Sequence, residues 1–351
     1  MSDKDKVLSI LKEVNFPGFT RDIVSFGLVN EAKFENGKAL VKIELTSTDP
    51  KLPLHLKSQI EEVLGQIEEI TESDIVIAVK KDANSSLSDA EENRISGIDK
   101  IIAIASGKGG VGKSTLAVNL ACALSRLGES LPQPLKIGLM DCDVYGPSVP
   151  LLLGSSDRPK LIGENILAPN ESFGIKLMSM GLLIDEESPV VWRGPMVMKT
   201  IQQFASNVEW GELDYLLIDL PPGTGDAQLS LAQTLPLNGA VIVTTPQKAA
   251  VDVARRGARM FEKVNVPILG VVENMSYLEN PENGEKNFIF GQGGGEKTSK
   301  DLNTRLLGHV PLDQNVREGG DHGIPVVISH SECRASLVFK EIASKIMEEA
   351  E

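Results

Sequence analysis

A glycine-rich segment restricts most strongly what this chain can fold into: Gly107-Lys108-Gly109-Gly110-Val111-Gly112-Lys113-Ser114-Thr115. It satisfies the spacing Gly-x-x-x-x-Gly-Lys-Ser/Thr, and it lies between an apolar run at 101–105 and an expected helix at 116–127. Glycines at this spacing let backbone N–H groups curl round phosphate groups, and the N-terminus of the following helix favours their charge. The segment therefore predicts a phosphate loop between a strand and a helix.

Two polar side chains at the end of the phosphate loop have defined tasks in nucleotide binding. Lys113 is placed to reach the β and γ oxygens of a nucleoside triphosphate, and the Ser114 hydroxyl is placed to hold Mg²⁺. We therefore expect ATP and Mg²⁺ as ligands. The predicted nucleotide-binding residues of the loop are Gly107, Lys108, Gly109, Gly110, Val111, Gly112, Lys113, Ser114 and Thr115.

Beyond residue 98, apolar runs alternate with stretches of helical periodicity. The clearest runs are 101–105, 137–140, 215–218, 240–243 and 268–272. Strands that are apolar throughout and separated by helices indicate a parallel sheet buried on both faces. The sequence therefore predicts the α/β fold of a P-loop NTPase, with a mostly parallel sheet covered by helices on both faces. Ligands of such sheets bind beyond the carboxyl ends of the strands.

The residues before this region have a pattern of their own. Apolar positions at helical spacing recur at 56–67, and strands are expected at 40–45 and 75–79. Residues 82–93 are polar and rich in Ser and acidic side chains, which cannot bury enough apolar surface to order themselves. The expected organisation is a small α/β domain at 1–80, a flexible linker at 81–97 and a P-loop ATPase domain at 98–351.

Aspartates stand where two of the apolar runs end. Asp141 and Asp143 follow one run, and Asp219 ends another before a glycine-rich segment at 220–226. Because ligands of a parallel sheet bind at this edge, these carboxylates are expected near the γ-phosphate and its metal ion. We assign Asp143 to orienting the attacking water or Mg²⁺, with Asp141 in support, and Asp219 to the Mg²⁺ site. A helix cap or turn is the alternative for Asp141 and Asp143.

Charge and cysteine content exclude several other classes of protein. The formal net charge of −14 gives an acidic field that repels nucleic acid and anionic lipid, and no basic patch opposes it. No apolar run approaches the roughly 20 residues that cross a bilayer, and the first residues lack a secretory pattern. We expect a cytoplasmic protein with no nucleic-acid or membrane partner. Cys122, Cys142 and Cys333 have no close spacing, so neither a disulfide framework nor a cysteine-rich zinc site is indicated.

A second lysine in the phosphate loop, Lys108, directly follows the first glycine. The arrangement Gly-Lys-Gly-Gly-x-Gly-Lys-Ser/Thr resembles the deviant loop of the nitrogenase iron protein, MinD and ParA class. That resemblance implies a homodimer in which Lys108 reaches the partner's nucleotide and neutralises charge in the transition state, as an arginine finger does elsewhere. Lys108 then joins Lys113 and Asp143 as a predicted catalytic residue. The alternative is that Lys108 is only a solvated charge.

Further segments extend the resemblance over nearly all of residues 98–351. They are 141–150, 192–196, 219–226, 272–277 and 308–313. Together they resemble the Mrp/ApbC iron-sulfur cluster carrier ATPases, in which Asn274 and the Pro311 region would flank adenine. Residues 22–29 and 45–46 look like the small iron-sulfur assembly domain often fused in front of these ATPases. The resemblance implies iron-sulfur apoproteins or assembly factors as partners.

The chain departs from this family at the cluster site. The family usually has Cys-Pro-x-Cys-Gly where this chain has Asn280-Pro281-Glu282-Asn283-Gly284, and Leu52-Pro53 stands where the N-terminal domain usually has Cys-Pro. Iron in such clusters prefers soft thiolate, whereas a neutral amide is a hard and weak donor. The sequence therefore identifies no iron-sulfur ligands, and a bridging cluster is expected to be absent or held differently. Of the cysteines, only Cys142 has a plausible functional location.

Two other groups of residues have no assigned role. The segment Trp192-Arg193-Gly194-Pro195 fits either a substrate or dimer contact or surface packing. His322 and His330, with Cys333, lack metal-ligand spacing and are expected to be solvated or packed.

Three functions remain open at this point. The leading hypothesis is a slow, Mg²⁺-dependent ATPase that carries or assembles iron-sulfur clusters as a nucleotide-gated homodimer. The second is a MinD/ParA-like switch, which would need a basic face or basic amphipathic tail, whereas the amphipathic stretch 336–349 ends acidic. The third is an adaptor that binds ATP without turnover and involves no cluster.

Overall fold

A computed structural model divides the chain into two compact units, Met1–Glu92 and Asn93–Glu351. The structure describes residues 7–8, 10–12, 14, 23–24, 28–35, 37–46, 52–65, 67, 70, 72–80, 95–144, 146–162, 166–183, 200–201, 203–223 and 225–350. The segment 192–195 and most of the expected linker lie outside these residues.

The first unit pairs a small sheet with a helix. Its elements are β1 (Val29–Glu35), β2 (Lys38–Thr46), α2 (Leu52–Gly65) and β3 (Glu72–Lys80). β2 lies between the other two strands, antiparallel to β1 and parallel to β3. Val41 and Ile43 of β2 are buried with Leu56 and Ile60 of α2, because strand alternation and helical spacing each place apolar side chains on one face. The strands at 40–45 and 75–79 and the helix at 56–67 were predicted, whereas β1 was not.

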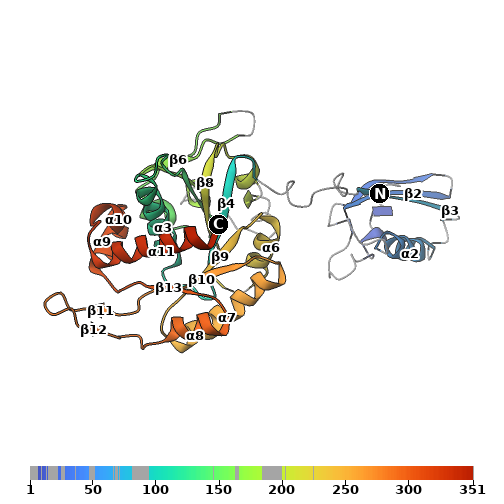
Figure 1. The fold of residues 1–351 in the computed structure, drawn as a ribbon. Helices are drawn as coiled ribbons and strands as arrows, with labels where there is room; N and C mark the ends of the chain where they lie inside the picture. Colours follow the sequence, from blue (N-terminus) through green and yellow to red (C-terminus); the bar gives the residue numbers. More distant parts are fainter. Residues whose placement is uncertain are drawn as a thin grey trace. The chain divides into compact units, whose positions relative to one another are not determined.

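The second unit is built on an eight-stranded sheet (Figure 1). Its strands are β4 (Ile98–Ser106), β5 (Ile137–Asp141), β6 (Asn170–Ser172), β7 (Ile175–Ser179), β8 (Leu213–Asp219), β9 (Gly239–Thr244), β10 (Ile268–Glu273) and β13 (Leu306–His309). Their order in space is β13-β10-β9-β4-β8-β5-β7-β6, and every pairing is parallel except that of β6 with β7. The predicted fold class, a mostly parallel sheet, is confirmed.

Helices cover both faces of this sheet. They are α3 (Lys113–Gly128), α4 (Val149–Leu152), α6 (Asp226–Thr234), α7 (Lys248–Lys263), α8 (Gly294–Asp301), α9 (Gln314–His322), α10 (Val326–Ser329) and α11 (Arg334–Ala350). Ile102 and Ile104 of β4 pack in one buried cluster with residues of α3 and α11, whereas Ile101 and Ala103 pack in another with residues of α6 and α7. Successive residues of a strand point to opposite faces, so a fully apolar strand supplies both clusters. Among the described residues, no helix is long and apolar enough to span a bilayer.

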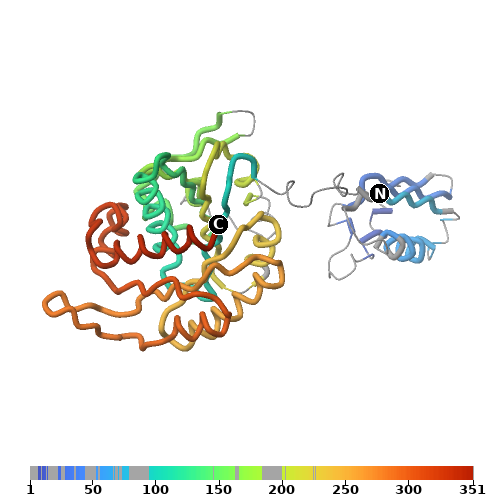
Figure 2. The backbone as a smooth tube through the Cα atoms, in the orientation of Figure 1, coloured from blue at the N-terminus to red at the C-terminus, as the bar shows by residue number. Residues whose placement is uncertain are grey.

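A two-stranded hairpin projects from this unit (Figure 2). It consists of β11 (Leu278–Glu279) and β12 (Lys286–Asn287), which pair antiparallel. Tyr277 anchors its base: the ring is buried, and the Lys286 ammonium lies 4.2 Å from the ring centroid. This hairpin carries Asn280 and Asn283, which the sequence resemblance sets against the family's cysteines.

Candidate nucleotide-binding site

The phosphate loop connects β4 to α3 at the carboxyl edge of the sheet. Gly110 and Gly112 have φ values of +77° and +79°, a left-handed conformation that L side chains rarely adopt. Gly107 is required for a different reason, because a Cβ there would lie 2.5 Å from the backbone of Val253 in α7. The glycine spacing read from the sequence thus shapes a tight loop that ends at the N-terminus of α3, where Gly112 precedes Lys113.

Lys113 and Ser114 both contact the same carboxylate, that of Asp219 at the end of β8. Lys113 Nζ lies 2.5 Å from Asp219 Oδ1, and Ser114 Oγ lies 2.5 Å from Asp219 Oδ2. The Lys113 side chain is 6% exposed and that of Asp219 is fully buried. The structure therefore brings together three residues that sequence reasoning assigned to the phosphates and Mg²⁺. Hydroxyl and carboxylate oxygens are the donors that Mg²⁺ prefers, so this set fits the ion.

Asp141 lies beside Asp219, since the two are register partners in β5 and β8. Burial, together with the charge of Asp219, raises the pKa of Asp141 to about 7. Burial also raises the pKa of Asp219, although the Lys113 charge opposes that change. One group of the pair thus holds a proton most readily, and it is Asp141, because Asp219 has the lysine as its counter-ion.

The Asp141 carboxylate accepts hydrogen bonds from the backbone that follows β5. Its Oδ1 accepts the Asp143 backbone N–H at 3.0 Å, and its Oδ2 accepts the Ser179 hydroxyl at 3.0 Å and the Val149 N–H at 3.3 Å. These bonds attach Asp141 to the backbone of the loop that carries Asp143. The Asp143 side chain is buried, and its charge contributes to raising the pKa of Asp219. Ser179, at the end of β7, carries no sequence signal, because only the fold brings it to Asp141.

The segment after β8 is tied to the phosphate loop. The Gly223 N–H donates to the Ser106 carbonyl at 3.0 Å, and Gln228 Nε2 of α6 donates to the same carbonyl at 3.2 Å. Gln228 also donates to the Pro221 carbonyl. Gln228 is buried and was missed by sequence analysis, since a glutamine on a helix has no motif that marks it. These bonds connect Pro221 and Gly223 to the point where the phosphate loop begins.

Asn274 and Pro311 lie on adjacent chain segments that extend β10 and β13. The Val310 N–H donates to the Glu273 carbonyl at 2.8 Å, and the Ser276 N–H donates to the Val310 carbonyl at 2.9 Å. Asn274 Nδ2 donates to the Val111 carbonyl of the phosphate loop at 2.8 Å. The two residues expected to flank adenine are therefore placed on paired segments, one of which contacts the phosphate loop directly.

Lys108 and the cysteines occupy contrasting environments. The Lys108 side chain is exposed, whereas Cys122 and Cys142 are fully buried in the two core clusters. Burial raises the pKa of Cys122 to about 12 and raises that of Cys142 as well. Cys142 is therefore a core residue whose thiol is shielded from solvent, although its position in the sequence suggested a functional location. Cys333 is half-buried beside Ser336.

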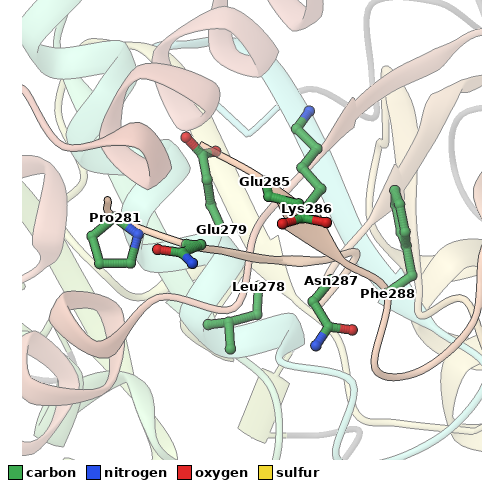
Figure 3. A pocket seen from close by; sticks show the side chains of 8 residues that line it. Leu278, Glu279, Pro281, Glu285, Lys286, Asn287 and Phe288 are labelled. Atoms are coloured by element: carbon green, nitrogen blue, oxygen red, sulfur yellow. The ribbon is translucent and has the colours of Figure 1, made fainter. Parts of the chain in front are cut away.

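The hairpin tip uses its asparagines as turn residues. Asn280 Oδ1 accepts the Glu282 N–H at 2.9 Å, and Asn283 Oδ1 accepts the Glu285 N–H at 3.0 Å. Such bonds to the backbone two residues on are the ordinary chemistry of asparagine in turns. Figure 3 shows the side chains that line an open pocket on this hairpin, from Leu278, Glu279, Asn280, Pro281, Glu285, Lys286, Asn287 and Phe288. The pocket offers oxygen and nitrogen atoms and no thiolate.

Comparison with known proteins identifies the family. Residues 97–347 match the model of the NUBPL iron-transfer P-loop NTPases, and residues 4–75 match that of an iron-sulfur cluster assembly protein domain. The chain belongs to the NUBPL iron-transfer P-loop NTPase family. An iron-sulfur cluster carrier protein from Synechocystis sp. is 42% identical over 99% of this chain and 97% of its own length. A NUBPL iron-sulfur cluster transfer protein from Mus musculus is 47% identical over 73% of this chain and 79% of its own.

Solved structures agree with the fold. A nucleotide-binding protein from Archaeoglobus fulgidus, solved in complex with ADP and with Co found in it, is 37% identical. It covers 68% of this chain and 91% of its own length, with a TM-score of 0.59. The septum site-determining protein MinD from Pyrococcus horikoshii, with Mg-ADP, is 24% identical over 71% of this chain and 96% of its own, with a TM-score of 0.52. The latter likeness concerns the fold alone.

Proposed function

We propose that this chain is a slow, Mg²⁺-dependent ATPase that acts as a cytoplasmic, nucleotide-gated homodimer in carrying or assembling iron-sulfur clusters. The contact of Lys113 and Ser114 with the buried Asp219 carboxylate supports the proposal most directly. An ammonium group, a hydroxyl and a carboxylate within hydrogen-bond distance are the groups that MgATP requires. When bound, Mg²⁺ would supply positive charge to the β and γ oxygens, held by Ser114, Asp143 and Asp219.

The chain's own residues then have separable tasks. Lys113 exchanges its contact with Asp219 for the phosphate oxygens, and the backbone N–H groups of the phosphate loop hold the remaining charge. Asp143 orients the attacking water, and Asp141 holds the loop that carries Asp143. The exposed Lys108 is free to reach the nucleotide of a second copy. Asn274 and Pro311 flank the base.

Binding and turnover of MgATP test this assignment. The full chain should bind a fluorescent ATP analogue and release phosphate slowly, and Asp143→Ala should reduce release strongly while leaving binding close to wild type. Lys136→Ala is a matched control, because Lys136 is an exposed lysine that pairs with Glu212 away from the site. An unchanged rate in Asp143→Ala would show that another group orients the water.

The identity of the cargo is a separate part of the proposal. The family resemblance favours a cluster or its apoprotein as the substrate, whereas the turn bonds of Asn280 and Asn283 favour an adaptor that holds no cluster at the hairpin. Iron and acid-labile sulfide should be measured in anaerobically purified chain, with and without ATP. A lasting stoichiometric cluster would establish a carrier with other ligands, and none under any reconstitution condition would favour the adaptor.

A further inference from the structure

One histidine contacts two carboxylates at the base end of the candidate site, the part next to the Asn274 and Pro311 segments that are expected to flank the nucleotide base. His309 ends β13, and Glu273, its register partner, ends β10. His309 Nδ1 lies 3.1 Å from Glu273 Oε1, and His309 Nε2 lies 3.2 Å from Oε1 of Glu296 in α8. A single imidazole ring thus connects the ends of two strands with the first turn of a helix.

Glu273 also caps α8. The Gly295 N–H donates to Glu273 Oε2 at 2.5 Å, and Ser276 Oγ lies 2.8 Å from Glu273 Oε1. A Cβ on Gly295 would lie 2.8 Å from the Glu273 Cβ, so only glycine lets the helix approach this closely. The Glu273 side chain is 3% exposed. A carboxylate buried to this degree is stable only when donors satisfy it, and His309 is one of them.

These contacts adjoin the segments that would hold the base. Asn274, which bonds the phosphate loop, directly follows Glu273, and Val310 and Pro311 directly follow His309. The Glu273 carbonyl accepts the Val310 N–H. Any loosening between Glu273 and His309 therefore changes the spacing of the two segments expected on either side of adenine.

The number of protons on His309 decides how many of these contacts exist. A neutral imidazole has one N–H and can donate to one carboxylate, whereas the charged ring donates to both. The hydrogen bond to Glu273 raises the pKa of His309 above its ordinary value of 6.5, with burial opposing the rise. Among the described residues, the charged groups that face the ring are Glu273 from β10, Glu296 from α8 and Lys286 from β12, and of these the lysine alone opposes protonation.

The same three side chains also satisfy the spacing of a small divalent-metal site. Two features favour a proton instead. The two ring nitrogens face different carboxylates, so one ion cannot replace both contacts, and Glu273 already accepts hydrogen bonds from Gly295 and Ser276. A charged imidazole, which donates to both carboxylates, completes the hydrogen bonds of the cluster without a metal ion.

We propose that His309 is a positioning residue whose protonated ring clamps β10, β13 and α8 together and thereby tightens nucleotide binding at the base end of the site. This inference rests on the proposed nucleotide-binding function. The charged ring holds Glu296 as well as Glu273. As the ring loses its proton with rising pH, the link to one carboxylate is lost, and nucleotide affinity falls. The direction follows from a group whose pKa is raised in the folded chain.

The test is the affinity for a fluorescent ADP analogue from about pH 6 to about pH 9, a range that brackets histidine titration. The full chain is compared with His309→Gln, Glu296→Gln and the control His322→Gln, since His322 is exposed at the end of α9. In wild type, affinity should fall about fivefold across the range, a typical coupling between two sites. His309→Gln should reduce this dependence to the part that Asp141, whose pKa is about 7, contributes, and the control should retain it in full.

Glu296→Gln separates positioning from a merely structural role. Glu296 is half-exposed, so the variant should fold, and it removes a charge that favours the imidazolium. The pH midpoint of affinity, and the ring's own pKa measured by NMR, should both shift downward. Identical pH profiles of nucleotide affinity in wild type and His309→Gln would overturn the role proposed for His309 and would leave the nucleotide-binding function standing. Stoichiometric Zn²⁺ binding that is lost in Glu296→Gln would contradict the proposal, because it would show that a metal ion, and not a proton, links the three side chains. No nucleotide binding at any pH would overturn the proposed function and the clamp together.

Discussion

Lys113 and Asp219 form a buried ion pair with Nζ and Oδ1 2.5 Å apart, although 106 positions separate them in the sequence. The pair lies at the junction of the phosphate loop with β8, beside a second buried carboxylate, Asp141. Lys113 is thus the cation that opposes the charge of these carboxylates as well as the residue expected to bind phosphate. Its removal should therefore affect both stability and function.

Lys113→Ala should abolish measurable ATP turnover and destabilise the nucleotide-free chain. Breaking a buried pair by removing one partner costs about 3 kcal/mol or more, because the remaining charge is uncompensated. Denaturant unfolding gives the stability, and phosphate release gives the rate. Lys136→Ala, which removes an exposed partner of Glu212, should change neither quantity. A Lys113→Ala chain as stable as wild type would show that the pair is not formed in solution.

Gly112→Ala should weaken nucleotide binding more than Asn274→Ala does. A Cβ at Gly112 would lie 2.2 Å from Asn274 Nδ2, and its φ of +79° adds backbone strain. Asn274→Ala removes one hydrogen bond, to the Val111 carbonyl, which is worth about 1 kcal/mol. Calorimetric titration with ADP would rank the two variants. Gly65→Ala, where no atom lies within 4 Å of the new Cβ, should bind as wild type does. The reverse ranking would contradict the left-handed conformation of Gly112 and its close approach to Asn274.

The double variant Asn280→Cys/Asn283→Cys tests whether the hairpin retains the geometry of a cluster site. It creates the Cys-x-x-Cys spacing that the resemblance implies for the family, and because the turn bonds are exposed, their loss should cost no more than about 1 kcal/mol. Anaerobic reconstitution should then give iron and sulfide above the wild-type amount. Asn280→Ser/Asn283→Ser, which keeps turn-forming side chains without thiols, should give the wild-type amount. Equal iron in all three proteins would show that the hairpin no longer takes part.

The sequence was sufficient to predict most strands of the sheet and the residues expected to bind the phosphates. Strands such as 101–105 and 215–218 are apolar throughout because both faces are buried, and aspartates at strand ends lie at one edge because the strands are parallel. β7 and β13 were missed, since they are 5 and 4 residues long and lack a distinct period. The Asn283-Gly284 pair is a local turn signal, but the sequence prediction treated Asn283 only as a replaced cysteine and did not predict the turn.

The base end of the site could not be read from sequence for a different reason. Glu273, Glu296 and His309 come from three elements, and neither their spacing nor their residue types form a motif. Their contact depends on the register of β10 with β13 and on glycine at 295. Register is a property of the assembled sheet, so only the fold reveals that one histidine lies between two carboxylates.

Lys108 offers a test of dimeric catalysis that needs no structure of the dimer. If Lys108 serves the partner's nucleotide, Lys108→Ala should retain ADP binding, because the side chain is exposed and the backbone N–H groups of the loop are unchanged. Its turnover should fall about a thousandfold, the scale of an arginine finger. Lys113→Ala should be equally inactive. Each variant alone therefore has two defective sites per dimer.

Mixing the two variants distinguishes action across the dimer from action within one chain. In a mixed dimer, the Lys108→Ala chain has an intact Lys113 and receives Lys108 from its partner, so one site of the two is complete. Phosphate release should therefore reappear on mixing, at about a quarter of the wild-type rate when half of the dimers are mixed and one of their two sites works. If Lys108 acts on the nucleotide of its own chain, both sites of the mixed dimer lack a lysine, and mixing restores nothing.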